Sequence, residues 1–176
     1  LFKETSLKIK KINNDLGNDT NKLLANTVLT FSDLKTNRMT DYKFDLDKFT
    51  NISGKTGIYV QYALVRAKKL LKSSSIKTNN INLNILDLDE SDLNLIRGMI
   101  KFEYYFNLAL QNNEPHHLAD YLYELSNLFN AMYQNENILE NKSETVKLNK
   151  LKISEYFISY STLLMECLGL EPVEKM

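Results

Sequence analysis

The chain has 176 residues, and its 22 Lys and Arg residues balance 22 Asp and Glu residues, so the formal net charge is zero. This length suits one domain of roughly 100–200 residues, with or without an appended element. No apolar run approaches the roughly 20 residues of a membrane-spanning helix, and no signal peptide opens the chain. A single cysteine, Cys167, excludes an internal disulfide, so we expect a protein of the reducing cytoplasm.

The apolar residues recur at helical spacing along most of the chain. Five glycines and two prolines provide few tight turns, which argues against a β-sandwich or barrel. The predicted helices begin at a capping residue, a glycine or a proline, and together they predict an all-α bundle of four or five helices. They run from Asp19 through Phe31, from Gly57 to about Lys72, from Ser91 through Leu110, from Pro115 through Met132, and from Ser143 to a stop at Gly169.

Two segments do not fit the helical pattern. Ser73–Leu86 is polar and rich in asparagine, so we expect a loop there. Tyr42–Asp47 alternates apolar and polar residues, which predicts a short extended piece. Cys167 lies among apolar residues near the end of the last helix, and we expect it to be a small core residue. Because the chain starts at Leu1 without an initiator Met, we expect a part of a longer protein.

The charges are unevenly distributed although they sum to zero. Residues 48–86 carry seven bases and no acid, whereas residues 87–140 carry ten acids and two bases. Such blocks are often only solvated faces. They also allow a localised positive surface that the net charge conceals.

No residue pattern in the chain predicts catalysis. The sequence has no glycine-rich phosphate loop and no dinucleotide fingerprint. His116 and His117 are adjacent, so on a helix they should point about 100° apart, and a metal site with Asp120 is a minor alternative. The acids at 87, 89, 90 and 92 lack the glycine and the final glutamate of a calcium loop, and acids are favoured before a helix by its dipole. We therefore expect no catalytic residues and no metal.

The segment Gly54–Lys69, GKTGIYVQYALVRAKK, carries the most specific pattern. On a helix its apolar residues form one stripe, and Tyr59, Tyr62, Arg66 and Lys69 form a second stripe on the other side. Tyrosine rings stack on unpaired bases, and arginine or lysine neutralises phosphates, so this stripe is a candidate single-stranded RNA surface. The alternative is that the tyrosines pack against a neighbouring helix.

Four segments in the same order resemble arginyl-tRNA synthetases. The GKTGIYVQYALVR segment resembles the family pattern GNTGPYLQYAHAR, and DLKTNRMTDYKFDLD, residues 33–47, resembles its D-L-S-x-N-R-x-x-D-Y-x-F-D-W-D. YLYELSNLFN, residues 121–130, is similar to Y-L-Y-D-L-A-x-L-F-x, and the end LGLEPVEKM is similar to L-G-I-E-x-P-E-R-M. The ordered set, from about Thr27 to Met176, is more specific than any one motif.

This resemblance implies a helical anticodon-binding domain of the DALR type at residues 48–176, preceded by a junction at residues 1–47. The whole enzyme joins arginine to its tRNA with ATP and Mg, and the catalytic domain that holds them would lie upstream. The implied partners are the anticodon stem-loop of tRNA(Arg) and the chain's own catalytic domain, in a monomer without membrane contact. The chain itself is expected to hold no cofactor.

The resemblance also assigns candidate tRNA-binding residues. Tyr62 and Arg66 match the residues that meet the anticodon loop, and Tyr59 matches the first tyrosine of the motif. Asn51–Lys55 matches a loop that folds against the anticodon. Further expected contacts come from the segment 133–137 and from the chain terminus. The full set of candidates is Lys55, Tyr59, Tyr62, Arg66, Lys69, Tyr133, Gln134 and Met176.

The chain departs from the family pattern at several positions. Lys55 replaces the usual Asn and adds a cation, Ile58 replaces Pro at the helix start, and Leu64 replaces His. An aromatic residue usual near Ile138 is missing, so contacts from 133–137 are the least secure. Two alternatives remain: the related domain of another class I synthetase, with the cysteinyl enzyme as the nearest, or a helical protein-interaction module with an acidic half.

Overall fold

The computed structural model describes residues 1–78, 81–135 and 137–176, and these are helical with short connections. No strand occurs within these ranges, so the all-α prediction is confirmed. In chain order the elements are α1 (Phe2–Ile12), α2 (Asn18–Leu34), α3 (Leu46–Phe49), α4 (Gly57–Ser74), η1 (Ile85–Asp87), α5 (Glu90–Ile100), α6 (Phe102–Asn112), α7 (His116–Asn135), η2 (Ile138–Glu140) and α8 (Glu144–Cys167).

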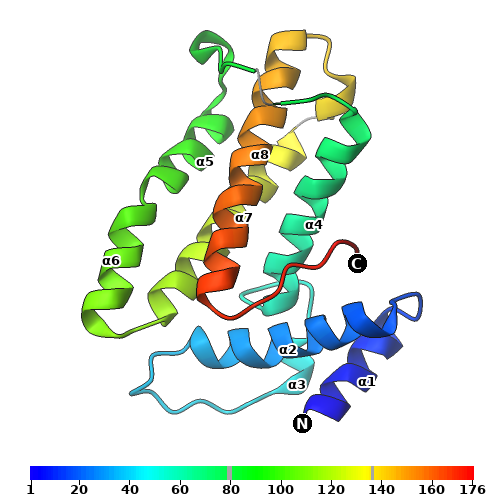
Figure 1. The fold of residues 1–176 in the computed structure, drawn as a ribbon, viewed down its shortest axis with the longest axis vertical. Coiled ribbons are helices and arrows are strands. Elements are labelled where there is room, and N and C mark those ends of the chain that lie inside the picture. The colour runs from blue at the N-terminus through cyan, green and yellow to red at the C-terminus, as the bar shows by residue number, and fades with distance from the viewer. Residues whose placement is uncertain (79–80, 136) are drawn as a thin grey trace.

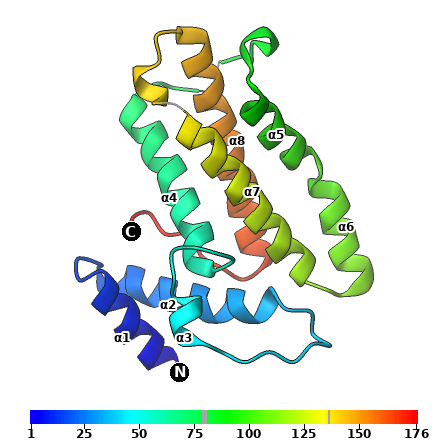
Figure 2. The same cartoon turned by 180° about the vertical axis from the view of Figure 1, so that it is seen from behind.

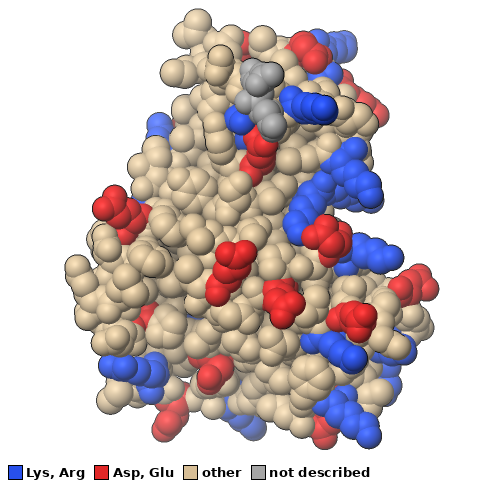
Figure 3. Space-filling view, viewed as in Figure 1, with Lys and Arg blue, Asp and Glu red and all other residues tan. Residues whose placement is uncertain are grey.

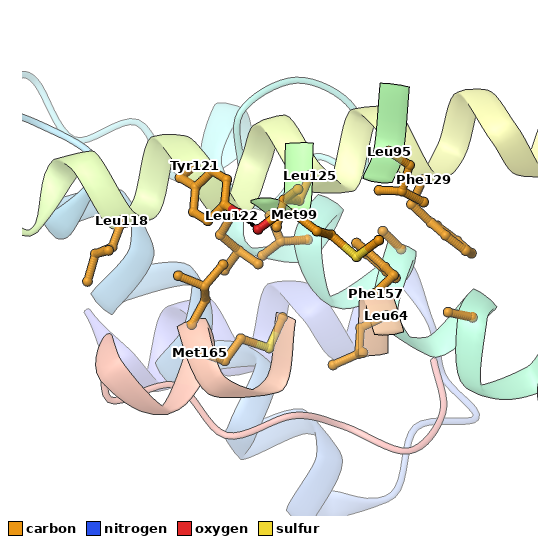
Figure 4. Close-up of a cluster of buried hydrophobic side chains, with 14 of the residues drawn as sticks. Leu64, Leu95, Met99, Leu118, Tyr121, Leu122, Leu125, Phe129, Phe157 and Met165 are labelled. Atoms are coloured by element: carbon orange, nitrogen blue, oxygen red, sulfur yellow. Dashed lines mark hydrogen bonds between the residues drawn. The ribbon is translucent and has the colours of Figure 1, made fainter. Parts of the chain in front are cut away.

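Helices α4, α5, α7 and α8 form the body of the molecule, and α6 continues the line of α5 (Figure 1). Seen from behind, α7 lies between α4 and the α5–α6 pair (Figure 2). Their apolar stripes meet in one core, and Figure 4 shows part of it, with Leu122, Leu125 and Phe129 of α7 facing Leu64 of α4 and Phe157 of α8. The buried Tyr121 hydroxyl donates to the carbonyls of Gly98 and Met99, at 2.9 and 3.1 Å, which joins α7 to the end of α5.

Helix α2 crosses below the body, and α1 lies beside it (Figure 1). These two helices have their own apolar cluster, which reaches the body through residues of α3, α4 and the C-terminal tail. The cluster members that make this link are Phe49, Ile58 and Val173. Helix α1 was not predicted, because only Thr5 and Ile9 of its eleven residues are buried. The boundary expected between residues 47 and 48 stays a prediction.

The helix ends differ from the sequence prediction in three places. Helix α2 begins after Gly17, and not with Asp19 as the cap. Helix α5 begins after Asp89, whose side chain accepts from the Asp92 backbone N–H in a reciprocal capping box, so the prediction of Ser91 as the cap was wrong. The helix predicted from Ser91 through Leu110 is two helices that part at Lys101.

The other predicted boundaries agree more closely. Helix α4 starts at Gly57, as predicted, and runs two residues past Lys72. Ser143 caps α8, and Gly169 ends it with φ at +66°, a left-handed conformation that glycine adopts without strain. Two backbone hydrogen bonds, from Leu170 N–H to Met165 O and from Gly169 N–H to Glu166 O, complete this stop.

One smaller prediction was wrong, and two hold only in part. At Tyr42–Asp47, where a short extended piece is expected, Asp45 is extended with φ −125° and ψ 104°, but Leu46 and Asp47 already belong to α3. Cys167 is exposed and not a core residue, because it lies in the last turn of α8 on the side away from the bundle. The loop predicted at Ser73–Leu86 is irregular at residues 75–78 and 81–84, whereas Ser73 and Ser74 belong to α4 and Ile85 and Leu86 to η1. Residues 79–80 lie outside the described residues.

Candidate nucleic-acid interface

The start of α4 is fixed by one threonine. The Thr56 hydroxyl accepts from the Tyr59 backbone N–H at 3.1 Å and donates to the Asn51 carbonyl at 2.7 Å. It therefore caps α4 and closes the preceding loop at the same time. Val60, Ala63 and Leu64 then face the core. The second stripe, formed by Tyr59, Tyr62, Arg66 and Lys69, is half-buried to exposed.

Arg66 lies between two tyrosine rings. Its guanidinium carbon is 4.5 Å from the ring centroid of Tyr62 on the same helix and 4.8 Å from that of Tyr133 on α7. One guanidinium nitrogen donates to the Tyr62 hydroxyl at 2.7 Å, and the other donates to Asn130 Oδ1 at 2.9 Å. The structure thus brings together three of the predicted residues, Tyr62, Arg66 and Tyr133, in one cluster across α4 and α7.

Asn130 is a member of this cluster that sequence reasoning missed. It lies at 7% exposure on α7, where its amide oxygen accepts the Arg66 hydrogen bond. Asn130 is the last residue of the segment 121–130, which resembles the family pattern but was not predicted to contact Arg66. A buried asparagine needs a polar partner, which was the available signal, but the partner's identity depends on how α7 pairs with α4.

Tyr59 points into the same helix pair but away from Arg66. Its hydroxyl donates to Asn127 Oδ1 at 2.7 Å, and its ring lies 5.4 Å from that of Tyr123. The alternative considered for the aromatic stripe, packing against a neighbouring helix, therefore describes Tyr59. Lys69, the last residue of the stripe, is exposed.

Lys55 is held from two sides. Its ammonium group forms an ion pair with Asp120 of α7, and its backbone carbonyl accepts from Lys35 Nζ at 2.6 Å. These contacts tie the loop before α4 to both α7 and the end of α2. The cation predicted near the RNA surface is therefore partly neutralised by an acid of the same chain.

Met176 and Tyr62 line one cavity of about 560 Å³, together with apolar residues of α1 and Ile58. The C-terminal tail is held on α4 by Gln61, which donates to the Glu171 carbonyl at 2.8 Å and accepts from the Val173 backbone N–H at 3.0 Å. This anchor holds the tail on α4, where Met176 and Tyr62 line the same cavity. Gln61 belongs to the GKTGIYVQYALVR motif but was not predicted as a site residue.

Tyr133 of the cluster also borders a second cavity at the C-terminal end of α7. This cavity has a volume of about 350 Å³ and is further lined by Leu70, Ile138 and the exposed Gln134. Ile138 is buried, near the position where the resemblance implies an aromatic residue. The predicted contact segment 133–137 includes residue 136, which lies outside the described residues.

The side chains of His116 and His117 lie closer together than the sequence predicts. The rings of His116 and His117 lie 4.1 Å apart, so the prediction that they point apart was wrong. Their ring nitrogens and a Glu114 oxygen lie within 4.8 Å of one another. Glu114 already accepts hydrogen bonds from His117 at 3.0 Å, the main cause of its lowered pKa, and from Asn37 at 3.2 Å. Asp120, the third ligand considered from the sequence, pairs with Lys55 instead.

Residues 60–176 match a family model described as the DALR anticodon binding domain. The chain belongs to this family. The predicted DALR-type domain is therefore confirmed, and relatives that are arginine–tRNA ligases confirm the resemblance to arginyl-tRNA synthetases. Within the described residues, no helix is long and apolar enough to cross a membrane.

Curated relatives of this DALR domain are arginine–tRNA ligases. The ligase of Buchnera aphidicola subsp. Schizaphis graminum is 35% identical over 157 residues, which cover 88% of this chain and 27% of the relative. That of Serratia proteamaculans is 30% identical over 172 residues, covering 96% of this chain and 30% of the relative. The chain thus spans less than a third of the length of these relatives.

Solved structures agree with the fold. The arginyl-tRNA synthetase of Plasmodium falciparum superposes with a TM-score of 0.87 at 28% identity, over 99% of this chain and 33% of the other. That of Thermus thermophilus superposes with a TM-score of 0.88 over 99% of this chain and 31% of the other, and at 22% identity it supports the fold alone.

Proposed function

We propose that this DALR domain binds the anticodon stem-loop of tRNA(Arg) as part of an arginine–tRNA ligase. The observation that carries the proposal is the Tyr62–Arg66–Tyr133 cluster, which spans α4 and α7 of the matched domain, with Tyr62 lining the same cavity as Met176. Aromatic rings stack on unpaired bases, which contributes about 1–3 kcal/mol per base, and a guanidinium binds phosphate or a base edge.

The ligase reaction is assigned to the longer protein and not to this chain. That reaction joins arginine to tRNA with ATP and Mg, and no residue pattern of this sequence forms a phosphate loop for ATP. We place the protein in the cytoplasm as a monomer, with tRNA(Arg) and its own catalytic domain as partners. The contribution of the chain is to hold the anticodon loop in a fixed orientation.

Fluorescence anisotropy with labelled RNA hairpins tests this function. We expect the hairpin with an arginine anticodon to bind more tightly than the same hairpin with a cysteine anticodon. Tyr62→Ala should weaken binding by about tenfold, which is the loss of one stacked base. Tyr104→Ala is the matched control, because Tyr104 lies on α6 and is 64% exposed.

Other results would favour the domain of the cysteinyl enzyme or a protein-interaction module. Preference for the cysteine anticodon would favour the domain of the cysteinyl enzyme. No retention on heparin and no shift with total tRNA would favour a protein-interaction module. Equal binding by the Tyr62→Ala and Tyr104→Ala variants would contradict the assignment of the interface to α4.

A further inference from the structure

Three lysines surround a small cavity at the start of α4. Lys35 follows the end of α2, Lys48 lies in α3, and Lys55 lies in the loop before α4. Together with loop residues that include Asn51 and Thr56, they line a cavity of about 270 Å³, which we call the lysine pocket. Three successive segments of the chain thus bring like charges to one place.

These positive charges are only partly compensated by the chain. Lys35 is half-buried, and its Nζ donates to the Lys55 carbonyl and lies 4.6 Å above the Phe49 ring, neither of which carries a full negative charge. Burial, together with the charges of Lys55 and Lys48, lowers the pKa of Lys35. In the described parts of the chain, neither Lys35 nor Lys48 forms an ion pair, and only Lys55 has one, with Asp120. Such a cluster of cations is costly without an anion.

The backbone around the lysine pocket is suited to an anion. Gly54 has φ at +80°, and its carbonyl accepts from the Thr56 N–H at 2.9 Å, which makes a tight turn directly before α4. Helix α4 has 18 residues and begins directly after this turn, with Thr56 as its N-cap. The helix dipole places partial positive charge there, in addition to the three ammonium groups.

The lysine pocket is one loop away from the largely apolar cavity that Tyr62 and Met176 help to line. Asn51 lines both cavities, so the segment around it separates them. A nucleotide consists of an apolar base and a charged phosphate, and the two cavities offer these two environments side by side.

We propose that the lysine pocket binds one phosphate group, with Lys35, Lys48 and Lys55 as its ligands and Asp120 as the carboxylate that the anion competes with. The phosphate comes either from the RNA backbone, which rests on the function proposed above, or from free phosphate. Asp120 holds Lys55 in the absence of the anion, and a phosphate takes over this ammonium group.

Titration with inorganic phosphate at constant ionic strength, followed by calorimetry, tests the pocket itself. Lys48→Gln should weaken phosphate binding by about tenfold, which is the loss of one charge-assisted contact. Its control is Lys43→Gln, an exposed lysine outside the pocket. Asp120→Asn should strengthen phosphate binding by up to about fivefold, because the competing carboxylate is removed, and Asp41→Asn is its control. Equal affinities in Lys48→Gln and Lys43→Gln, or no gain in Asp120→Asn, would overturn the proposal.

The same variants with the arginine-anticodon hairpin identify the source of the phosphate. If the RNA backbone occupies the pocket, Lys48→Gln weakens hairpin binding and lowers the slope of log affinity against log salt by about 0.7–0.9, while Lys43→Gln does not. If Lys48→Gln lowers only phosphate affinity, the pocket binds free phosphate. Loss of hairpin binding in every protein, with phosphate binding intact, would contradict the proposed function and leave the anion site standing.

Discussion

Arg66 illustrates how far single residues could be placed from the sequence. Its pairing with Tyr62 follows from a spacing of four on a helix, and it was predicted. Its contacts with Asn130 and Tyr133 depend on which helix packs against α4 and at what height, which no local pattern specifies. For the same reason, the sequence could not predict that the Tyr59 hydroxyl donates to Asn127 of α7.

Gly57 of α4 packs so closely against Thr27 of α2 that there is no room for a Cβ atom. A Cβ at this position would lie 2.7 Å from the Thr27 carbonyl oxygen, which is backbone and cannot rotate away. We expect Gly57→Ala to lower the free energy of unfolding by about 1–3 kcal/mol, the usual cost of overpacking. Urea unfolding followed by circular dichroism measures this.

The control for Gly57 is Gly17→Ser. A Cβ at Gly17 meets no atom within 4 Å, and serine suits the N-cap position of α2. Its stability should equal or slightly exceed that of the parent. An unchanged stability in Gly57→Ala would show that α2 can move away from α4 at little cost.

The element that the sequence described least well is the α5–α6 pair. Asp89 and Ser91 are both acceptable caps for α5, and the choice is made by Lys150 of α8, whose fully buried ammonium group binds Asp89 and Asp92 at 2.8 and 2.9 Å. This partner lies about sixty positions away, so the local pattern could not indicate it. The acids before α5 therefore serve as caps and ion-pair partners, in line with the interpretation that preferred a helix start to a calcium loop.

Asp89 gives this junction an acid-sensitive contribution to stability. Burial alone would raise the pKa of its carboxyl, but hydrogen bonds from Lys150, Ser91 and the Asp92 backbone outweigh burial and lower the pKa to about 2. A carboxyl with a depressed pKa in the folded state stabilises the fold above its unfolded pKa of about 4, and this stabilisation is lost as the pH falls toward 2.

Asp89→Asn should therefore flatten the loss of stability between about pH 4 and pH 2, because asparagine keeps the cap but does not titrate. Thermal unfolding at a series of pH values measures the slope. Asp41→Asn, at an exposed loop position, controls for the loss of one carboxylate. A slope in Asp89→Asn as steep as in the parent would mean that other groups carry the acid sensitivity.

At the scale of the whole molecule, the zero net charge conceals an uneven surface. In Figure 3 many Lys and Arg side chains lie toward the right-hand edge, where Figure 1 places α4 and, below it, α1, and acids lie across the centre of this face. The sequence predicted this basic segment from the absence of acids at residues 48–86. It could not indicate that Lys55 and Lys68 of this segment are paired with Asp120 and Glu174, because those pairs join distant elements.

These pairs mean that the basic segment offers fewer unpaired cations than its composition suggests. Docking of RNA in one orientation then depends on a small number of groups, which include Arg66, Lys69 and the lysine pocket. Such a localised positive surface, with acids elsewhere, favours one orientation of a polyanion over indiscriminate binding.

The most direct test of an RNA interface at α4 and α7 is the dissociation constant of the chain for a tRNA(Arg) transcript in Arg66→Ala and in Arg97→Ala. Arg97 is an exposed arginine on α5 and is paired with Glu90, so both variants lose the same charge. We expect Arg66→Ala to raise the dissociation constant by about tenfold with its helical circular dichroism retained, and Arg97→Ala to leave it unchanged. Equal dissociation constants for the two variants would contradict an interface at these helices.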